Sequence, residues 1–101
     1  MKYYAVVQPT INEDSWLAAY LPAVSAFVAK HGGKYLARTQ TMEKIEGDDP
    51  LPSAFIIFEW PSKEAFHAFY NDPEYQSHKK ARLAGTSGAF TLVAADDFFA
   101  D

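Results

Sequence analysis

The sequence predicts an α+β domain in which a four-stranded antiparallel sheet carries its helices on one face. Residues 54–58 are apolar without interruption, which is typical of a strand covered on both faces. Elsewhere apolar residues recur at three- and four-residue steps, which predicts amphipathic helices before and after a pair of strands. A chain of 101 residues has room for one such domain and a single core.

The first strand and the first helix are predicted in the N-terminal third. Residues 3–8 are aromatic and β-branched and end at Pro9, a pattern that favours a strand. We expect the next helix to be capped by Asn12 or Asp14 and to end at the glycine pair 32–33. Its expected core-facing residues share one helical stripe: Leu17, Tyr20, Leu21, Val24, Phe27, Val28 and His31.

Pro22 interrupts this helical stripe. Proline lacks a backbone donor and clashes with the preceding turn, so we expect it to kink the helix or divide it. His31, the last residue of the stripe, is expected to interact with the negative end of the helix.

Two strands and a turn-rich loop are predicted next. Residues 35–45 form the long second strand of this prediction, and residues 55–60 form the third. Residues 46–52 between them are rich in turn formers. Ser62 is placed to cap a short helix whose apolar face contains Ala65, Phe66, Phe69 and Tyr70.

The C-terminal third predicts a further helical segment and a last strand. Asp72 is a good cap for a helical segment over residues 73–83. Residues 85–88 are expected to form a loop, and residues 89–95 are expected to form the last strand. The two phenylalanines of the tail, residues 96–101, are expected to dock on the body or on a partner.

This order of elements is that of a ferredoxin-like βαββαβ domain, 1–101, with its first and third strands central. Whichever side the helices cover, large apolar residues of both central strands remain on the other side. A patch of that kind is unusual on a monomer, so we expect two chains to pack these faces together as a homodimer.

Composition narrows the function classes. The net charge is −4 and the basic residues do not form a broad face, which argues against nucleic-acid binding. The chain has no cysteine, so disulfides, zinc–thiolate sites and thiol nucleophiles are excluded. The apolar run near the N-terminus is too short for a signal peptide or a membrane span, so we expect a cytoplasmic protein that does not bind membranes.

Three segments resemble signatures of one known family. Residues 32–38 (GGKYLAR) resemble its Gly-Gly-basic-aromatic-Leu-x-Arg signature, and residues 58–62 (FEWPS) and 70–76 (YNDPEYQ) resemble two others, in the right order. The family is the domain of unknown function 1330 family. The resemblance spans nearly the whole chain and implies a dimeric α+β barrel of ferredoxin-like subunits, with no established activity. The sequence departs from the family pattern at Thr39-Gln40, where glycines are frequent, and at Asp72, where serine is common.

Arg38 and Glu59 are the first candidate ligand-binding residues. Counting outward from the centre of the turn-rich loop places them opposite each other on neighbouring strands, and therefore on one face. They are interpreted as a cross-strand salt bridge or as a site where Arg38 grips a carboxylate.

Tyr75, His78 and Arg82 are the second candidate set. Their spacing places them on one helical stripe, where they could bind an anionic or phenolic molecule, with His78 as an acid or base. The alternative is an amphipathic surface stripe anchored by Tyr75. Trp16, Tyr20 and Phe27 are expected in the core, although Trp16 or Tyr20 could line a pocket between helix and sheet.

No pattern in the sequence matches a metal site, a phosphate loop or a nucleophile elbow, so we expect neither a cofactor nor a metal. Two function classes remain. The first is a dimeric protein that binds a small acidic or aromatic molecule. The second, by analogy with other dimeric ferredoxin-like barrels, is a cofactor-independent oxygenase or isomerase with a pocket between helices and sheet.

Overall fold

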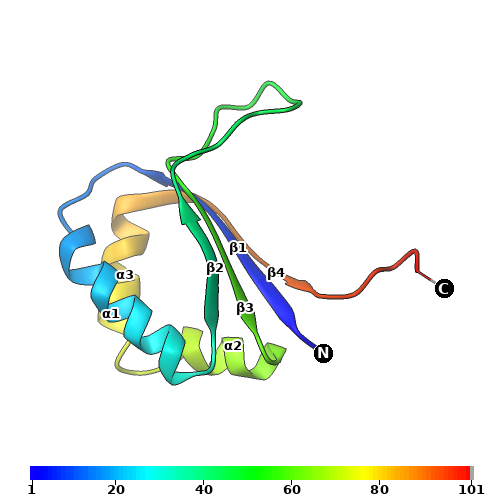
Figure 1. Ribbon diagram of the computed structural model, residues 1–101. Coiled ribbons are helices and arrows are strands. Elements are labelled where there is room, and N and C mark those ends of the chain that lie inside the picture. The colour runs from blue at the N-terminus through cyan, green and yellow to red at the C-terminus, as the bar shows by residue number, and fades with distance from the viewer. Residues whose placement is uncertain (101) are drawn as a thin grey trace.

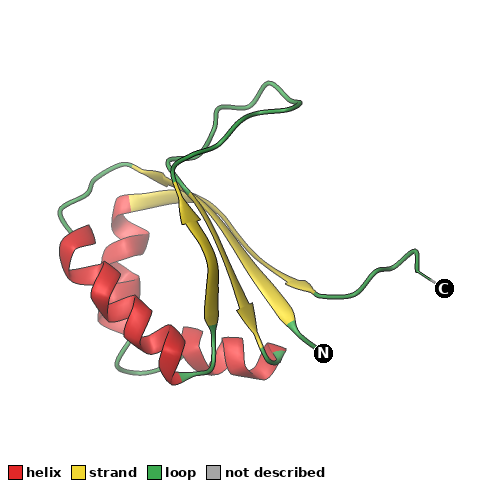
Figure 2. Cartoon of the chain, in the orientation of Figure 1, coloured by secondary structure: helices red, strands yellow, loops and turns green. Residues whose placement is uncertain are grey.

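The computed structural model describes residues 1–100 and contains one antiparallel sheet with three helices (Figure 1). The strands pair in the order β2-β3-β1-β4, so the two central strands are the first and third, as predicted. The helices lie on one side of the sheet and leave the other side without a helix (Figure 2). The elements are β1 Tyr3–Ile11, α1 Leu17–Lys30, β2 Lys34–Thr39, β3 Phe55–Trp60, α2 Lys63–Tyr70, α3 Gln76–Gly85 and β4 Thr86–Ala94.

The core lies between the helices and one face of the two central strands. Ala5 of β1 pairs with Phe58 of β3, and both are buried, which identifies their face as the one that packs against the helices. Trp60 is completely buried on the same face and stacks on Phe69 of α2, with ring centroids 5.1 Å apart. The buried apolar residues are Ala5, Tyr20, Val24, Val28, Phe58, Trp60, Phe66, Phe69 and Tyr75.

Helix α1 contains Pro22 without being divided by it. The residue lies on the exposed side of the helix, where water can bond the carbonyl that lacks its usual partner. Of the two expected effects of Pro22, division of the helix is therefore wrong, and a kink stays a prediction. The expected N-cap is also wrong, because the helix begins at Leu17 and neither Asn12 nor Asp14 caps it. Its end is as predicted: Gly32 has φ +85°, the left-handed geometry that glycine tolerates.

Strand β1 continues past Pro9 to Ile11 instead of ending at the proline. The carbonyl of Pro9 accepts a hydrogen bond from Ser53 N, at 2.8 Å, on the side away from β4. The N and C=O of one strand residue point the same way, so the missing N–H costs no bond to β4. Opposite Pro9 is Gly88, with φ +110°, where a Cβ would lie 2.3 Å from the Gln8 carbonyl oxygen.

Strand β2 ends at Thr39, six residues earlier than predicted, whereas β3 has the predicted bounds. Residues 40–54 form a connection without regular structure that projects beyond the sheet (Figure 1). A longer β2 would have to pair with the segment that holds Pro50 and Pro52, and prolines have no N–H to donate to a ladder.

The helices that follow β3 begin with different caps. Ser62 Oγ accepts from Ala65 N at 3.0 Å and caps α2 as predicted. Asp72 Oδ1 accepts from Glu74 N and caps a turn, but the regular helix starts only at Gln76. The expected loop over residues 85–88 is absent, because α3 runs to Gly85 and β4 starts directly at Thr86.

Gly85 is a packing position rather than a loop residue. Its carbonyl accepts hydrogen bonds from the backbone N–H groups of Asn12 and Glu13, and a Cβ there would collide with the ring of Trp16. The glycine therefore lets the end of α3 touch the segment that precedes α1.

The tail does not dock on the body of its own chain. It extends away from the sheet (Figure 1), and Phe98 and Phe99 are 87% and 90% exposed. The expectation of docking within the chain is therefore wrong for the described residues, and docking on a partner stays a prediction. Asp101 lies outside the described residues.

The helix-free face of the sheet carries large apolar residues, as the sequence predicts, together with the charged pair Lys34 and Glu59. The register places Tyr4 opposite Glu59 and Val6 opposite Ile57 on this face, with Val93 of β4 beside Tyr4. We call these four apolar or aromatic residues, Tyr4, Val6, Ile57 and Val93, together with Phe55, the open apolar face. No helix among residues 1–100 is long and apolar enough to cross a membrane.

Candidate functional site

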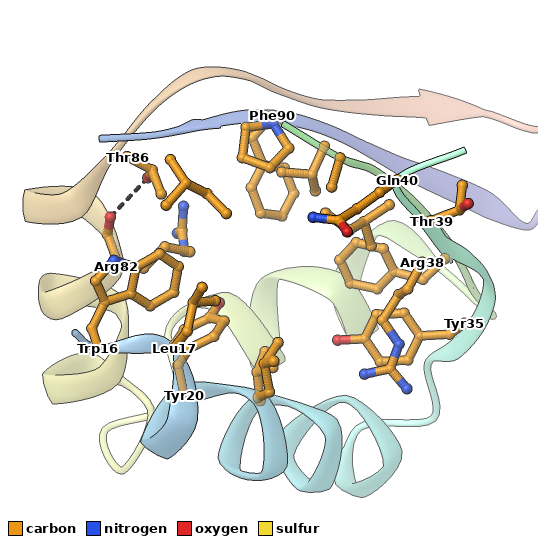
Figure 3. Close-up of a pocket in the computed structure, with 18 of the residues that line it drawn as sticks. Trp16, Leu17, Tyr20, Tyr35, Arg38, Thr39, Gln40, Arg82, Thr86 and Phe90 are labelled. Carbon is orange, nitrogen blue, oxygen red and sulfur yellow. Dashed lines mark hydrogen bonds between the residues drawn. The ribbon is translucent and has the colours of Figure 1, made fainter. Parts of the chain in front are cut away.

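A cavity of about 540 Å³ lies between α1, α3 and the helix-facing side of the sheet (Figure 3). Its wall is largely apolar, and both Trp16 and Tyr20 line it, as the sequence analysis allowed. The cavity is large enough for a small metabolite, because ligand pockets generally fall in this size range. The aromatic lining residues are Trp16, Tyr20, Tyr35, Phe58, Phe69, Tyr75 and Phe90.

Two phenols meet in the cavity wall. The hydroxyls of Tyr20 in α1 and Tyr75 before α3 are 2.6 Å apart and share a hydrogen bond, and both residues are buried. Burial raises the pKa of the Tyr20 phenol well above its usual range, and the nearby Arg82 only partly offsets that shift. Tyr20 is therefore a neutral hydrogen-bonding group at physiological pH.

Arg82 reaches from α3 toward the cavity near this pair of phenols (Figure 3). Its Nε and Nη2 atoms are buried, and among the described residues neither has a hydrogen-bond acceptor of suitable geometry. Its guanidinium lies 5.6 Å from the ring centroid of Phe90. Burial acts to lower the pKa of Arg82, but the nearby phenols of Tyr20, Tyr75 and Tyr70 raise it and the net shift is upward, so the side chain stays charged.

Arg38 lies at the other end of the cavity, on β2 (Figure 3). Its Nη1 donates to Ser25 Oγ at 2.7 Å, and its guanidinium stacks over the Tyr35 ring at 3.7 Å from the centroid. Burial raises the pKa of Tyr35 to about 12, against the lowering effect of Arg38. Arg38 is exposed, so water solvates the donors that protein groups leave free.

The predicted pairing of Arg38 with Glu59 is wrong. The register shifts between Tyr35 and Ala37, and Arg38 pairs with Ile56 whereas Glu59 pairs with Lys34. The two side chains therefore lie on opposite faces of the sheet. Glu59 forms an ion pair with Lys2 Nζ at 3.3 Å and does not line the cavity.

The predicted stripe of Tyr75, His78 and Arg82 is only partly brought together. Tyr75 and Arg82 both line the cavity, whereas His78 does not and instead lies beside Phe27, with ring centroids 6.3 Å apart. The two ends of the stripe thus belong to the candidate site, and its histidine lies outside.

His31 contacts a carboxylate instead of the last carbonyls of α1. Its Nε2 lies 2.7 Å from Asp72 Oδ2, and Lys30 Nζ lies 2.9 Å from the same atom. These contacts and the N–H of Glu74 hold the pKa of the Asp72 carboxyl well below its usual range. The ionised Asp72 carboxylate therefore stabilises the folded state at a pH above the ordinary carboxyl pKa. This stabilisation is lost as the pH falls toward the lowered pKa of Asp72. The cluster fastens α1 to the turn before α3, away from the cavity.

The cavity is poor in groups that titrate near neutral pH. Among residues 1–100, no Asp, Glu or His lines it. The same residues contain no group of three or more His, Asp or Glu that could hold a metal ion. The cavity therefore offers a ligand an apolar and aromatic surface, neutral phenols and cationic guanidinium groups.

A family model matches nearly the whole chain. Residues 2–96 match the model described as Domain of unknown function (DUF1330). The chain belongs to this family. The resemblance seen in the sequence is thereby confirmed, and DUF1330 carries no assigned activity. A comparison with curated proteins found no match.

Solved structures share the DUF1330 chain's fold at low sequence identity. A protein of unknown function from Rhodopseudomonas palustris has a TM-score of 0.76 and 20% identity, over 95% of this chain and 83% of that one. SnoaB, a cofactor-independent oxygenase from Streptomyces nogalater, has a TM-score of 0.65 and 17% identity, over 99% and 98%. A putative antibiotic biosynthesis monooxygenase from Chloroflexus aurantiacus has a TM-score of 0.51 and 15% identity, over 96% of both chains. These similarities establish the ferredoxin-like fold.

Proposed function

We propose that this DUF1330 protein is a homodimer in which the cavity of each chain binds a small aromatic molecule. The observation that carries the proposal is the cavity of about 540 Å³, whose largely apolar wall includes seven aromatic residues. Apolar aromatic pockets with a few convergent polar groups are the usual form of small-molecule sites. Ring stacking and burial supply the affinity, and the phenols and guanidinium groups at the wall orient the ligand.

The open apolar face supports the dimer. It is a set of side chains from β1, β3 and β4 that no helix among residues 1–100 covers, and exposed apolar patches mark interfaces. Two copies related by a twofold axis would bury the same patch on both chains. The helices and the cavity lie on the other side of each sheet, so dimer formation leaves both cavities available.

Catalysis is the second candidate, supported by the shared fold with SnoaB. An oxygenase or isomerase that removes a proton from its substrate needs a base with a pKa near the working pH. The phenols of Tyr20 and Tyr35 have pKa values raised by burial, and no carboxylate or histidine among residues 1–100 lines the cavity. These groups favour binding over base catalysis, so we rank the binding function first.

The binding function is tested by thermal unfolding with a panel of neutral and anionic bicyclic aromatic compounds. A ligand of the folded state at one hundred times its dissociation constant stabilises the protein by about 2.7 kcal/mol, which raises the melting temperature. We expect at least one aromatic compound to do so and aliphatic compounds of similar size to have no effect. Oxygen consumption measured with the same compound separates binding from oxygenation.

A matched pair of variants locates the ligand. Leu21 is half-exposed in the cavity wall, so Leu21→Trp should partly fill the cavity and reduce binding. Leu83 is similarly exposed on α3 but does not line this cavity, so Leu83→Trp should bind normally. Equal binding by both variants would place the ligand elsewhere and refute the proposal.

A further inference from the structure

The polar groups in the cavity wall near α3 bond mostly to one another. The hydroxyls of Tyr20 and Tyr75 share a hydrogen bond, and Thr86 Oγ1 donates to the backbone carbonyl of Arg82 at 2.7 Å. The Nε and Nη2 atoms of Arg82 are buried, so a ligand in the cavity cannot contact them. A charged group that recognises a ligand therefore has to be sought at the other end of the cavity.

The other end of the cavity is formed by four consecutive polar residues at the end of β2 and just after it. Arg38, Thr39, Gln40 and Thr41 all line the cavity. Figure 3 shows the first three of them together, on the opposite side of the site from Arg82. Arg38 is exposed, so its side chain is accessible where the buried atoms of Arg82 are not.

Contacts from α1 and β2 hold the Arg38 guanidinium in place. Its Nη1 donates to Ser25 Oγ at 2.7 Å, and Ser25 Oγ in turn donates to the backbone carbonyl of Leu21 at 2.8 Å. The single proton of the Ser25 hydroxyl is thus used, and its oxygen is left to accept from Arg38. The guanidinium also lies over the Tyr35 ring, 3.7 Å from the centroid. A guanidinium held in this way loses little conformational freedom when it binds an anion.

The charge of Arg38 is not paired with a carboxylate among residues 1–100. The carboxylates of these residues that form ion pairs are those of Glu59 and Asp72, and neither pairs with Arg38. The hydrogen bond to Ser25 uses one of the five N–H donors of the guanidinium. An anionic ligand in the cavity would therefore replace water at the free donors and would not compete with a carboxylate of the described protein.

We propose that the ligand is an aromatic carboxylate whose carboxylate group accepts hydrogen bonds from the free donors of Arg38, while its ring extends along the apolar wall toward α3. This assignment rests on the proposed binding function and specifies the class of ligand and its orientation. The planar fork of a guanidinium matches the two oxygens of a carboxylate. A single guanidinium also balances one negative charge, whereas a phosphate monoester carries more than one at neutral pH.

The test compares two probes of nearly identical shape, naphthalene-2-carboxylate and the neutral naphthalene-2-carboxamide, by calorimetric titration. We expect the wild-type protein to bind the carboxylate roughly 5- to 20-fold more tightly, because Arg38 is held in place and the cavity wall shields one side of the ion pair from water. Arg38→Met should abolish this preference and change the affinity for the amide by less than about threefold. Arg38→Lys, which keeps the charge but lacks the planar fork, should retain part of the preference.

Lys80→Met is the matched control for the loss of charge. Lys80 is exposed on α3 and does not line the cavity, so this variant removes one positive charge without touching the site. It should keep the wild-type preference for the carboxylate. An equal loss of preference in Lys80→Met and Arg38→Met would show a general effect of net charge and contradict the assignment of Arg38.

The remaining outcomes separate the assignment of Arg38 from the binding function. Equal binding of acid and amide by the wild type, or an unchanged preference in Arg38→Met, would overturn the assignment while leaving the binding function intact. Equal loss of both probes in Arg38→Met would show a packing role and also contradict the assignment. Absence of binding for both probes and for the whole aromatic panel would overturn the proposed function itself. Binding of the amide by Arg38→Met demonstrates that the variant is folded.

Discussion

Phe69→Ala is expected to lower the free energy of unfolding by about 3–5 kcal/mol, the usual range for removing a buried phenylalanine ring. Phe69 is 1% exposed and contacts Trp60, Tyr75, Phe66 and Phe58, so the substitution removes the ring at the centre of the aromatic core. Denaturant unfolding at one fixed protein concentration measures the change.

Phe98→Ala is the matched control, because the same ring is removed from a residue that is 87% exposed. We expect a change within about 0.5 kcal/mol, as for most surface substitutions. A loss for Phe98→Ala as large as that for Phe69→Ala would contradict the described packing. A smaller loss that grows with protein concentration would indicate that the tail docks on a partner.

Ile57→Asp is expected to convert the dimer into single chains. Ile57 lies on β3 in the middle of the open apolar face, opposite Val6, and a carboxylate there would be buried without a partner if two faces packed together. Light scattering at micromolar concentration should give the mass of two chains for the wild type and of one chain for the variant.

Leu83→Asp introduces the same charge at an exposed position of α3, on the helix side of the sheet and not on the open apolar face, and should leave the mass at two chains. A wild-type mass of one chain would contradict the proposed dimer. So would an Ile57→Asp variant that remains folded and keeps the mass of two chains.

Much of the fold follows from local sequence patterns. The apolar run at residues 54–58 identified β3, and the three- and four-residue spacing in residues 17–31 identified α1 and the face it buries. The order of elements then fixed β1 and β3 as central strands, since few topologies connect such units. In these elements the spacing of apolar residues along the sequence matches the face that the structure buries.

The errors arose where tertiary contacts override local preference. Pro9 and Gly88 both suggest breaks in a strand, yet they pair with each other inside the β1–β4 ladder. The pairing of Arg38 with Glu59 was misjudged because the count placed the centre of the connection too late in the chain, whereas Thr39 pairs with Phe55 and Arg38 with Ile56. The register shift between Tyr35 and Ala37 instead moves Arg38 to the helix-facing side. A bulge of this kind leaves no clear signal in one sequence.

The candidate site was only partly accessible to sequence reasoning. Spacing alone put Tyr75 and Arg82 on one helical stripe, and the structure brings both to the cavity. The hydrogen bond between Tyr20 and Tyr75 joins residues 55 positions apart and depends on how α1 packs near α3, which no local pattern encodes. His78 was included because its spacing fitted the stripe, but it lies outside the cavity wall.

The most direct test of the ligand site is a nitrogen-15 NMR titration of the wild-type protein with naphthalene-2-carboxylate. If the cavity binds the ligand, the largest shift changes will be in backbone amides around it, including those of Tyr20, Tyr35 and Arg82. Changes confined to residues of the open apolar face such as Tyr4 and Ile57, or no changes at saturating ligand, would contradict the assignment of this cavity as the binding site.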